Sequence, residues 1–148
     1  GERGGSGPPK SVGLIIDTSA VVAWERALAA DARIALDAEE ELLMPAAVWA
    51  EALVGVRLAG SAGRAAQRKA RLEAIRGIIG IEPFTQVIAE HYADIYSGLS
   101  ERGSLIPQND IAVAVPARCL GFGVLVGPRD EAHFREVASL EVRVLPIR

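Results

Sequence analysis

The feature that most constrains the fold is a short apolar run that ends abruptly in an acid. Residues Val12–Ile16 do not alternate with polar residues, and Asp17-Thr18-Ser19 follows them directly. A strand that is apolar on both sides is typical of a parallel sheet with both faces covered. Ligands of such sheets gather at the carboxyl ends of the strands. We therefore expect Asp17 at a functional edge; the alternative is that it only caps the next helix.

The rest of the chain alternates between short apolar runs and segments with helical spacing. This predicts an α/β fold, with a central parallel sheet of about five short strands flanked by helices on both faces. The 148 residues suit one domain, expected over 12–148 after a flexible Gly- and Pro-rich tail at 1–11. The expected strands are 12–16, 41–44, 80–83, 122–126 and 142–145, and the expected helices are 18–28, 31–40, 46–58, 64–79, 86–102, 110–120 and 130–137.

The composition favours a reducing compartment. Cys119 is the single cysteine, which excludes an internal disulfide. No apolar run approaches the roughly 18 residues of a membrane span, and the polar N-terminus shows no secretory signal. We therefore expect a cytoplasmic protein without a membrane segment.

Positive charge is concentrated in one part of the chain. The net charge is −3, yet residues 54–80 hold six basic residues against the single acid Glu73. Arg64, Arg68 and Arg71 fall on one face of the expected helix. They are candidates for gripping RNA phosphates, and a merely solvated face is the alternative.

Four acids stand where they could converge. Asp17 and Asp130 each follow an apolar strand, and Asp110 begins a helix, where it could also be an N-cap or a partner of the helix dipole. Glu51 lies among apolar neighbours, where an unpaired carboxylate costs several kcal/mol. Either a metal ion or an arginine such as Arg57 would offset that cost.

Carboxylates held close together without matching cations repel one another, and a divalent cation relieves the repulsion. Oxygen ligands favour Mg²⁺ or Mn²⁺, whereas zinc would need histidine or cysteine, and only His91 and His133 exist. Mg²⁺ bound by few carboxylates usually acts on phosphates. Such ions activate water in the cleavage of phosphodiesters.

These acids and their neighbours resemble the PIN domain. Asp17-Thr18-Ser19 after a strand, Glu51 on a helix, Asn109-Asp110 at a helix start and Asp130 with His133-Phe134 after a later strand occur in that family's order. The length and motif order are similar, more narrowly, to the VapC-type toxins of bacterial toxin–antitoxin pairs. The resemblance covers about Leu14 to Leu145.

The resemblance implies a metal-dependent ribonuclease with four catalytic acids, Asp17, Glu51, Asp110 and Asp130. Asp17 and Asp110 would bind Mg²⁺ or Mn²⁺, and the other two would bind it directly or through water. Ser19 and Asn109 would support the site through hydrogen bonds. It also implies a homodimer and a VapB-type antitoxin that silences the toxin in a hetero-oligomer. Many relatives carry Thr or Ser where Pro128 stands, which leaves the role of Asp130 the least defined.

Two other functions are alternatives, and the sequence speaks against the first. A haloacid-dehalogenase-type phosphatase would need a second aspartate where Ser19 stands. A catalytically idle PIN-like domain that binds RNA or a protein is the other alternative. Metal-dependent cleavage of RNA would separate the nuclease from the idle domain.

Overall fold

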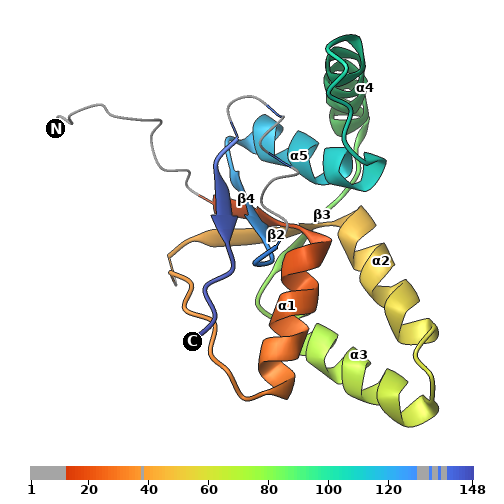
Figure 1. The fold of residues 1–148 in the computed structure, drawn as a ribbon, viewed down its shortest axis with the longest axis vertical. Coiled ribbons are helices and arrows are strands. Elements are labelled where there is room, and N and C mark those ends of the chain that lie inside the picture. Colours follow the sequence, from red (N-terminus) through yellow and green to blue (C-terminus); the bar gives the residue numbers. More distant parts are fainter. Residues whose placement is uncertain (1–12, 38, 130–133, 135–136, 138–139) are drawn as a thin grey trace, which may run out of the picture.

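The computed structural model describes residues 13–129 except 38, together with 134, 137 and 140–148. Strands and helices alternate along the chain (Figure 1). The elements are β1 (Gly13–Ile16), α1 (Thr18–Ala29), β2 (Glu41–Pro45), α2 (Ala46–Arg57), α3 (Ala62–Arg76), β3 (Gly80–Glu82), α4 (Gln86–Glu101), α5 (Gln108–Leu120), β4 (Gly123–Val126) and β5 (Val142–Val144).

The five strands form one parallel sheet in the order β3-β2-β1-β4-β5. β1 lies at the centre and pairs with β2 on one side and β4 on the other. The chain builds outward from β1 to β3 and then crosses β1 to form β4 and β5. The order therefore reverses between β1 and β4, and ligands of open α/β sheets bind at such a switch point. The predicted α/β fold is confirmed.

Helices cover both faces of the sheet, as predicted. α1 and α3 lie on one side, and α4 and α5 lie on the other (Figure 1). This division follows from right-handed crossovers, because the connections that move outward and the one that moves back must pass over opposite faces. α2 packs against β2 and β3 and touches both α1 and α5. The starts of these three helices therefore border the carboxyl edge of the sheet.

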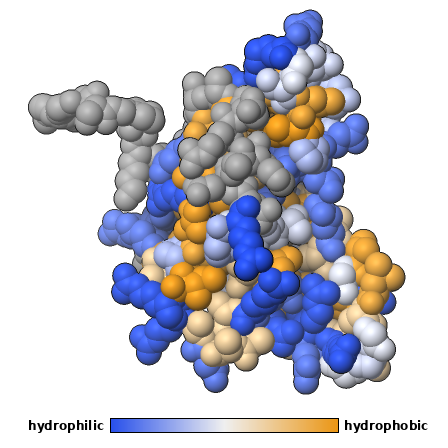
Figure 2. Space-filling view, in the orientation of Figure 1, coloured by the Kyte–Doolittle hydropathy of each residue, from blue (hydrophilic) through white to orange (hydrophobic). Residues whose placement is uncertain are grey.

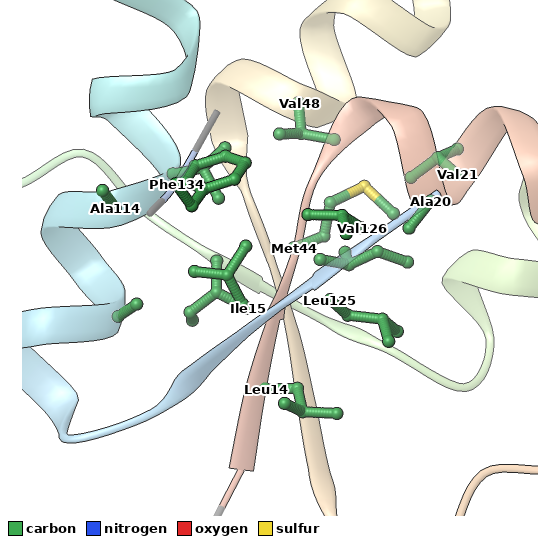
Figure 3. Close-up of a cluster of buried hydrophobic side chains, with 14 of the residues drawn as sticks. Leu14, Ile15, Ala20, Val21, Met44, Val48, Ala114, Leu125, Val126 and Phe134 are labelled. Carbon is green, nitrogen blue, oxygen red and sulfur yellow. The ribbon is translucent and has the colours of Figure 1, made fainter. Parts of the chain in front are cut away.

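The core explains why the first strand does not alternate. Leu14, Ile15 and Ile16 are all fully buried, because both faces of β1 are covered. Figure 3 shows Ile15 on the side of Ala114 and Phe134, whereas Val21 and Met44 lie on the opposite side. No described helix combines the length and the apolar composition that crossing a membrane requires.

The predicted helix at 31–40 is wrong. Within this range, the described residues run without helical structure, and Ile34 forms an antiparallel bridge with Ile147. Arg33 exchanges two backbone hydrogen bonds with Arg148. Asp31 has a positive φ of 55°, which ends the preceding helical path. The predicted helix at 130–137 and the predicted tail at 1–11 lie outside the described residues.

Candidate active site

Asp17 stands at the carboxyl end of the central strand and is only 6% exposed. Its backbone is extended (φ −84°, ψ 160°), and its amide donates to the carbonyl of Leu125 on β4 at 2.9 Å. The carboxylate Oδ2 accepts hydrogen bonds from Ser19 Oγ at 2.6 Å and from Ser19 N at 3.1 Å. Asp17 is thus the N-cap of α1 and lies at the switch point as well. The capping role and a functional position are compatible here.

Ser19 joins the start of α1 to the end of β4. Its Oγ accepts a hydrogen bond from the amide of Gly127 at 2.9 Å while it donates to Asp17. A Cβ on Gly127 would lie 2.7 Å from the carbonyl oxygen of Ser19, closer than such atoms approach. Only glycine permits this approach, so Gly127 helps to fix the Asp17 carboxylate. Gly127 was not predicted from the sequence as a site residue; a glycine directly after an apolar strand was the available signal.

Glu51 is held beside the same helix start. It lies half-buried on α2, and its Oε1 accepts a hydrogen bond from Thr18 Oγ1 at 3.0 Å. Because Thr18 directly follows Asp17, this bond brings the second acid to the edge where β1 ends. The alternative partner, Arg57, is exposed and forms no ion pair with Glu51. Thr18 is a second residue that the sequence analysis did not assign to the site.

Asp110 and Asn109 come from the first turn of α5. Pro107 occupies the N-cap position without a side-chain cap bond, so the alternative in which Asp110 is the N-cap of α5 is wrong. Asp110 is half-buried where a carboxylate interacts favourably with the helix dipole. Asn109 is exposed. α5 packs against β1 and α2, which carry the other acids or lead to them.

The described residues contain no group of three or more His, Cys, Asp or Glu side chains placed to hold a metal ion. Two neighbouring hydroxyl groups hold two of the acids at the same helix start. Ser19 donates to Asp17, and Thr18 donates to Glu51. Asp130 and His133 lie outside the described residues. The candidate cation site therefore consists of Asp17 and Glu51, with Asp110 on the neighbouring helix α5.

The three arginines predicted for RNA binding differ in their surroundings. Arg64 is exposed and Arg71 is half-buried. Arg68 donates to both carboxylate oxygens of the buried Glu25, at 3.1 and 3.2 Å, and to the carbonyl of Gly55 at 2.8 Å. The hydrogen bond with Glu25 raises the pKa of Arg68 above its usual value. Arg68 thus joins α3 to α1 and α2 through its pairing with Glu25, whereas RNA binding by the three arginines stays a prediction.

Comparisons with known proteins agree with this architecture. The PIN domain family profile matches residues 14–140. Proteins with curated descriptions gave no match to the sequence. Among solved structures, the VapBC2 complex of Rickettsia felis, bound to a DNA fragment from its promoter, contains a chain with a TM-score of 0.72 and 16% identity, over 90% of this chain and 98% of that one.

Two further solved structures are similar. VapBC-5 from Mycobacterium tuberculosis, described as a toxin–antitoxin system, gives a TM-score of 0.68 at 22% identity, over 90% of this chain and 98% of that one. FitAcB from Neisseria gonorrhoeae gives a TM-score of 0.70 at 27% identity, over 87% and 95%. The family profile spans most of the chain, from the first strand to the approach of the last. The protein therefore belongs to the PIN domain family.

Proposed function

We propose that the protein is an endoribonuclease that uses Mg²⁺ or Mn²⁺ to hydrolyse RNA phosphodiesters, and that it is the toxin of a toxin–antitoxin pair. One observation carries the proposal. The buried carboxylate of Asp17 is fixed by Ser19 at the switch point of the sheet, and Thr18 fixes Glu51 beside it. Membership of the PIN domain family supports the same reading.

The carboxylate oxygens of the candidate site suit a hard divalent cation. Asp17 and Glu51 offer oxygen ligands, and the hydrogen-bond donors that hold them are hydroxyl groups and an amide rather than cationic side chains. Mg²⁺ often keeps several waters and needs only one or two carboxylates, so a pair with Asp110 nearby is adequate. We propose Asp17 and Asp110 as ligands, with Glu51 and Asp130 binding directly or through water.

Each neighbouring residue has a definite task in this proposal. Ser19 donates to Asp17, which orients the carboxylate. Thr18 orients Glu51 in the same way. The exposed amide of Asn109 would hydrogen-bond to substrate or water. The cation, when bound, supplies an acidic water and offsets negative charge on the phosphate.

The proposed partners are RNA and a VapB-type antitoxin. The similar structures include complexes described as VapBC toxin–antitoxin systems, which supports this assignment. We also propose a cytoplasmic homodimer that joins its antitoxin in a hetero-oligomer. A catalytically idle domain that binds RNA or protein is the rival function.

An RNA cleavage assay tests the proposal. The parent protein should cut a mixed RNA pool with Mg²⁺ or Mn²⁺ and should not cut it in a chelator. Asp17→Asn and Glu51→Gln should abolish cutting, whereas Asp94→Asn, which removes an equal charge from the exposed face of α4, should not. A catalytically idle domain would bind the RNA but would not cut it under any of these conditions.

A further inference from the structure

A row of hollows runs from Ser19, at the start of α1, to the N-terminal part of α3. The first, of about 600 Å³, is lined in part by Ser19 and Gly127 of the candidate site and by Arg26. The second, of about 290 Å³, shares Arg26 with the first. The third, of about 530 Å³, shares Arg71 with the second. Because neighbouring hollows share lining side chains, they lie next to one another along α1 and α3, and together they are called the path here.

The charged side chains that line this path are mostly arginines, in a protein whose net charge is −3. Among the described residues that line it, the one acid is Glu25, which is paired with Arg68. Figure 2 shows strongly hydrophilic side chains gathered over α1 and α3 on this face. The remaining lining arginines, named here the basic track, are Arg129, Arg26, Arg71 and Arg64.

The arginines of the basic track are available for a ligand. None of them forms an ion pair with a residue in the described part of the chain. The Nε donor of Arg71 is buried and has no hydrogen-bond acceptor among the described residues. Buried donors are rarely left in this state, because desolvation without a partner costs free energy. An anionic ligand bound to the guanidinium group of Arg71, which lines the second and third hollows, would offset this cost.

The track ends where the proposed chemistry occurs. Ser19 lines the first hollow and also donates the 2.6 Å hydrogen bond to Asp17. A polyanion lying along the track would therefore reach Ser19, which holds the Asp17 carboxylate. We propose that the basic track binds the phosphate backbone of single-stranded RNA and guides it to the acidic edge, with Arg26 and Arg71 as its central contacts. This inference rests on the proposed function and names two residues that the sequence did not indicate, Arg26 and Arg129.

The arrangement favours a flexible single strand for a steric reason. The contacts lie in separate hollows of about 290 to 600 Å³. The walls of the first include small side chains such as Ala23 and Ala27. A strand can bend to place successive phosphates against successive arginines. Such contacts position a nucleic acid without reading its sequence.

Salt dependence provides the quantitative test. Four phosphate contacts to a single strand predict a slope of log affinity against log salt of about −2.8, at about 0.7 per contact. Raising the salt from about 50 to 200 mM should then weaken binding about 50-fold. The variant Arg26→Gln/Arg71→Gln loses two contacts, so its slope should be about −1.4 and the same salt change should weaken binding only about 7-fold.

The experiment measures the fluorescence anisotropy of a labelled 12-residue single-stranded RNA at several salt concentrations. A chelator is present so that binding is separated from cleavage. The control Arg57→Gln/Arg118→Gln removes the same charge from exposed positions outside the three hollows and should keep the parental slope. The variant Arg26→Lys/Arg71→Lys keeps the positive charge, so it should also largely keep the parental slope. Matching melting curves would show that the variants are folded.

Three results would overturn the inference. The first is a parental slope in the Arg26→Gln/Arg71→Gln variant, and the second is a parent that does not bind the RNA at all. The third is polyglutamate, in place of RNA, binding with the same dependence on Arg26 and Arg71, which would indicate an acidic protein partner. If the slope falls as expected but no RNA is cut with metal, the nuclease proposal fails and the basic track stands.

Discussion

Replacing Gly127 by alanine should damage the candidate site from behind. The new Cβ would lie 2.7 Å from the carbonyl oxygen of Ser19 and 3.1 Å from its carbonyl carbon. These are backbone atoms, so they cannot turn aside as a flexible side chain would. The start of α1 must therefore move away from β4, and the 2.9 Å hydrogen bond from Gly127 to Ser19 must lengthen.

The magnitude follows from two contributions. Overpacking of this kind typically costs about 1–3 kcal/mol, and a weakened hydrogen bond adds about 0.5–1.5 kcal/mol. For a domain near this size, each kcal/mol lowers the melting midpoint by roughly 3–4 °C, so a fall of about 5–18 °C is expected. Because Ser19 also fixes Asp17, RNA cleavage should fall by about 10²-fold, the usual consequence of a 1 Å misplacement.

Thermal unfolding followed by circular dichroism, together with the cleavage assay, checks this prediction. Gly63→Ala is the matched control, because Gly63 lies in α3 and its added Cβ would meet nothing closer than 4.0 Å. That change should stabilise the protein by about 0.5–1 kcal/mol and leave cleavage unchanged. If Gly127→Ala melts and cuts like the parent, the contact between Gly127 and Ser19 does not position Asp17.

Three other changes test separate parts of the structure. Arg68→Met leaves Glu25 buried and unpaired, so the free energy of unfolding, measured in urea, should fall by about 3 kcal/mol. The double variant Glu25→Gln/Arg68→Met should recover much of that stability. Equal losses of stability in the two variants would show that the ion pair is not responsible. Thr18→Val keeps the shape but frees Glu51, so metal affinity or cleavage should fall about 10- to 100-fold, and unchanged kinetics would remove Thr18 from the site. Burial raises the pKa of the Cys119 thiol, so its alkylation near pH 8 should be slower than in the urea-unfolded chain, and equal rates would contradict the burial.

The sheet was predictable because its signals are local. Apolar runs such as Leu14–Ile16 and Val124–Val126 are buried on both faces, which is why they do not alternate. The segment at 31–40 was wrongly predicted as a helix. Its Ile34 and Leu36 lie two residues apart, which suits an extended chain, and the segment is held by pairing with the C-terminal residues. That partner is distant in sequence, so no local pattern indicates it.

The candidate site was predictable in position but not in detail. Acids after buried strands must meet at the carboxyl edge, which located Asp17 correctly. The hydrogen bonds that hold it depend on how α1 packs against β4, and sequence spacing does not specify this. Helical spacing likewise grouped Arg68 with Arg64 and Arg71, but packing against α1 gave Arg68 a buried partner. Glu25 beside the buried Trp24 offered the same signal as Glu51, an acid on an apolar helix.

Thermal melting with and without Mn²⁺ tests whether the acidic edge binds a divalent cation. At a Mn²⁺ concentration of about 100 times the dissociation constant, binding should stabilise the parent by about 2.7 kcal/mol, or roughly 8–11 °C. Asp17→Asn retains a side chain that can cap α1, so it should melt close to the parent in chelator but gain little from Mn²⁺. Asp94→Asn should respond like the parent. Equal stabilisation of the parent and Asp17→Asn by Mn²⁺ would show that the cation binds elsewhere and would contradict the account.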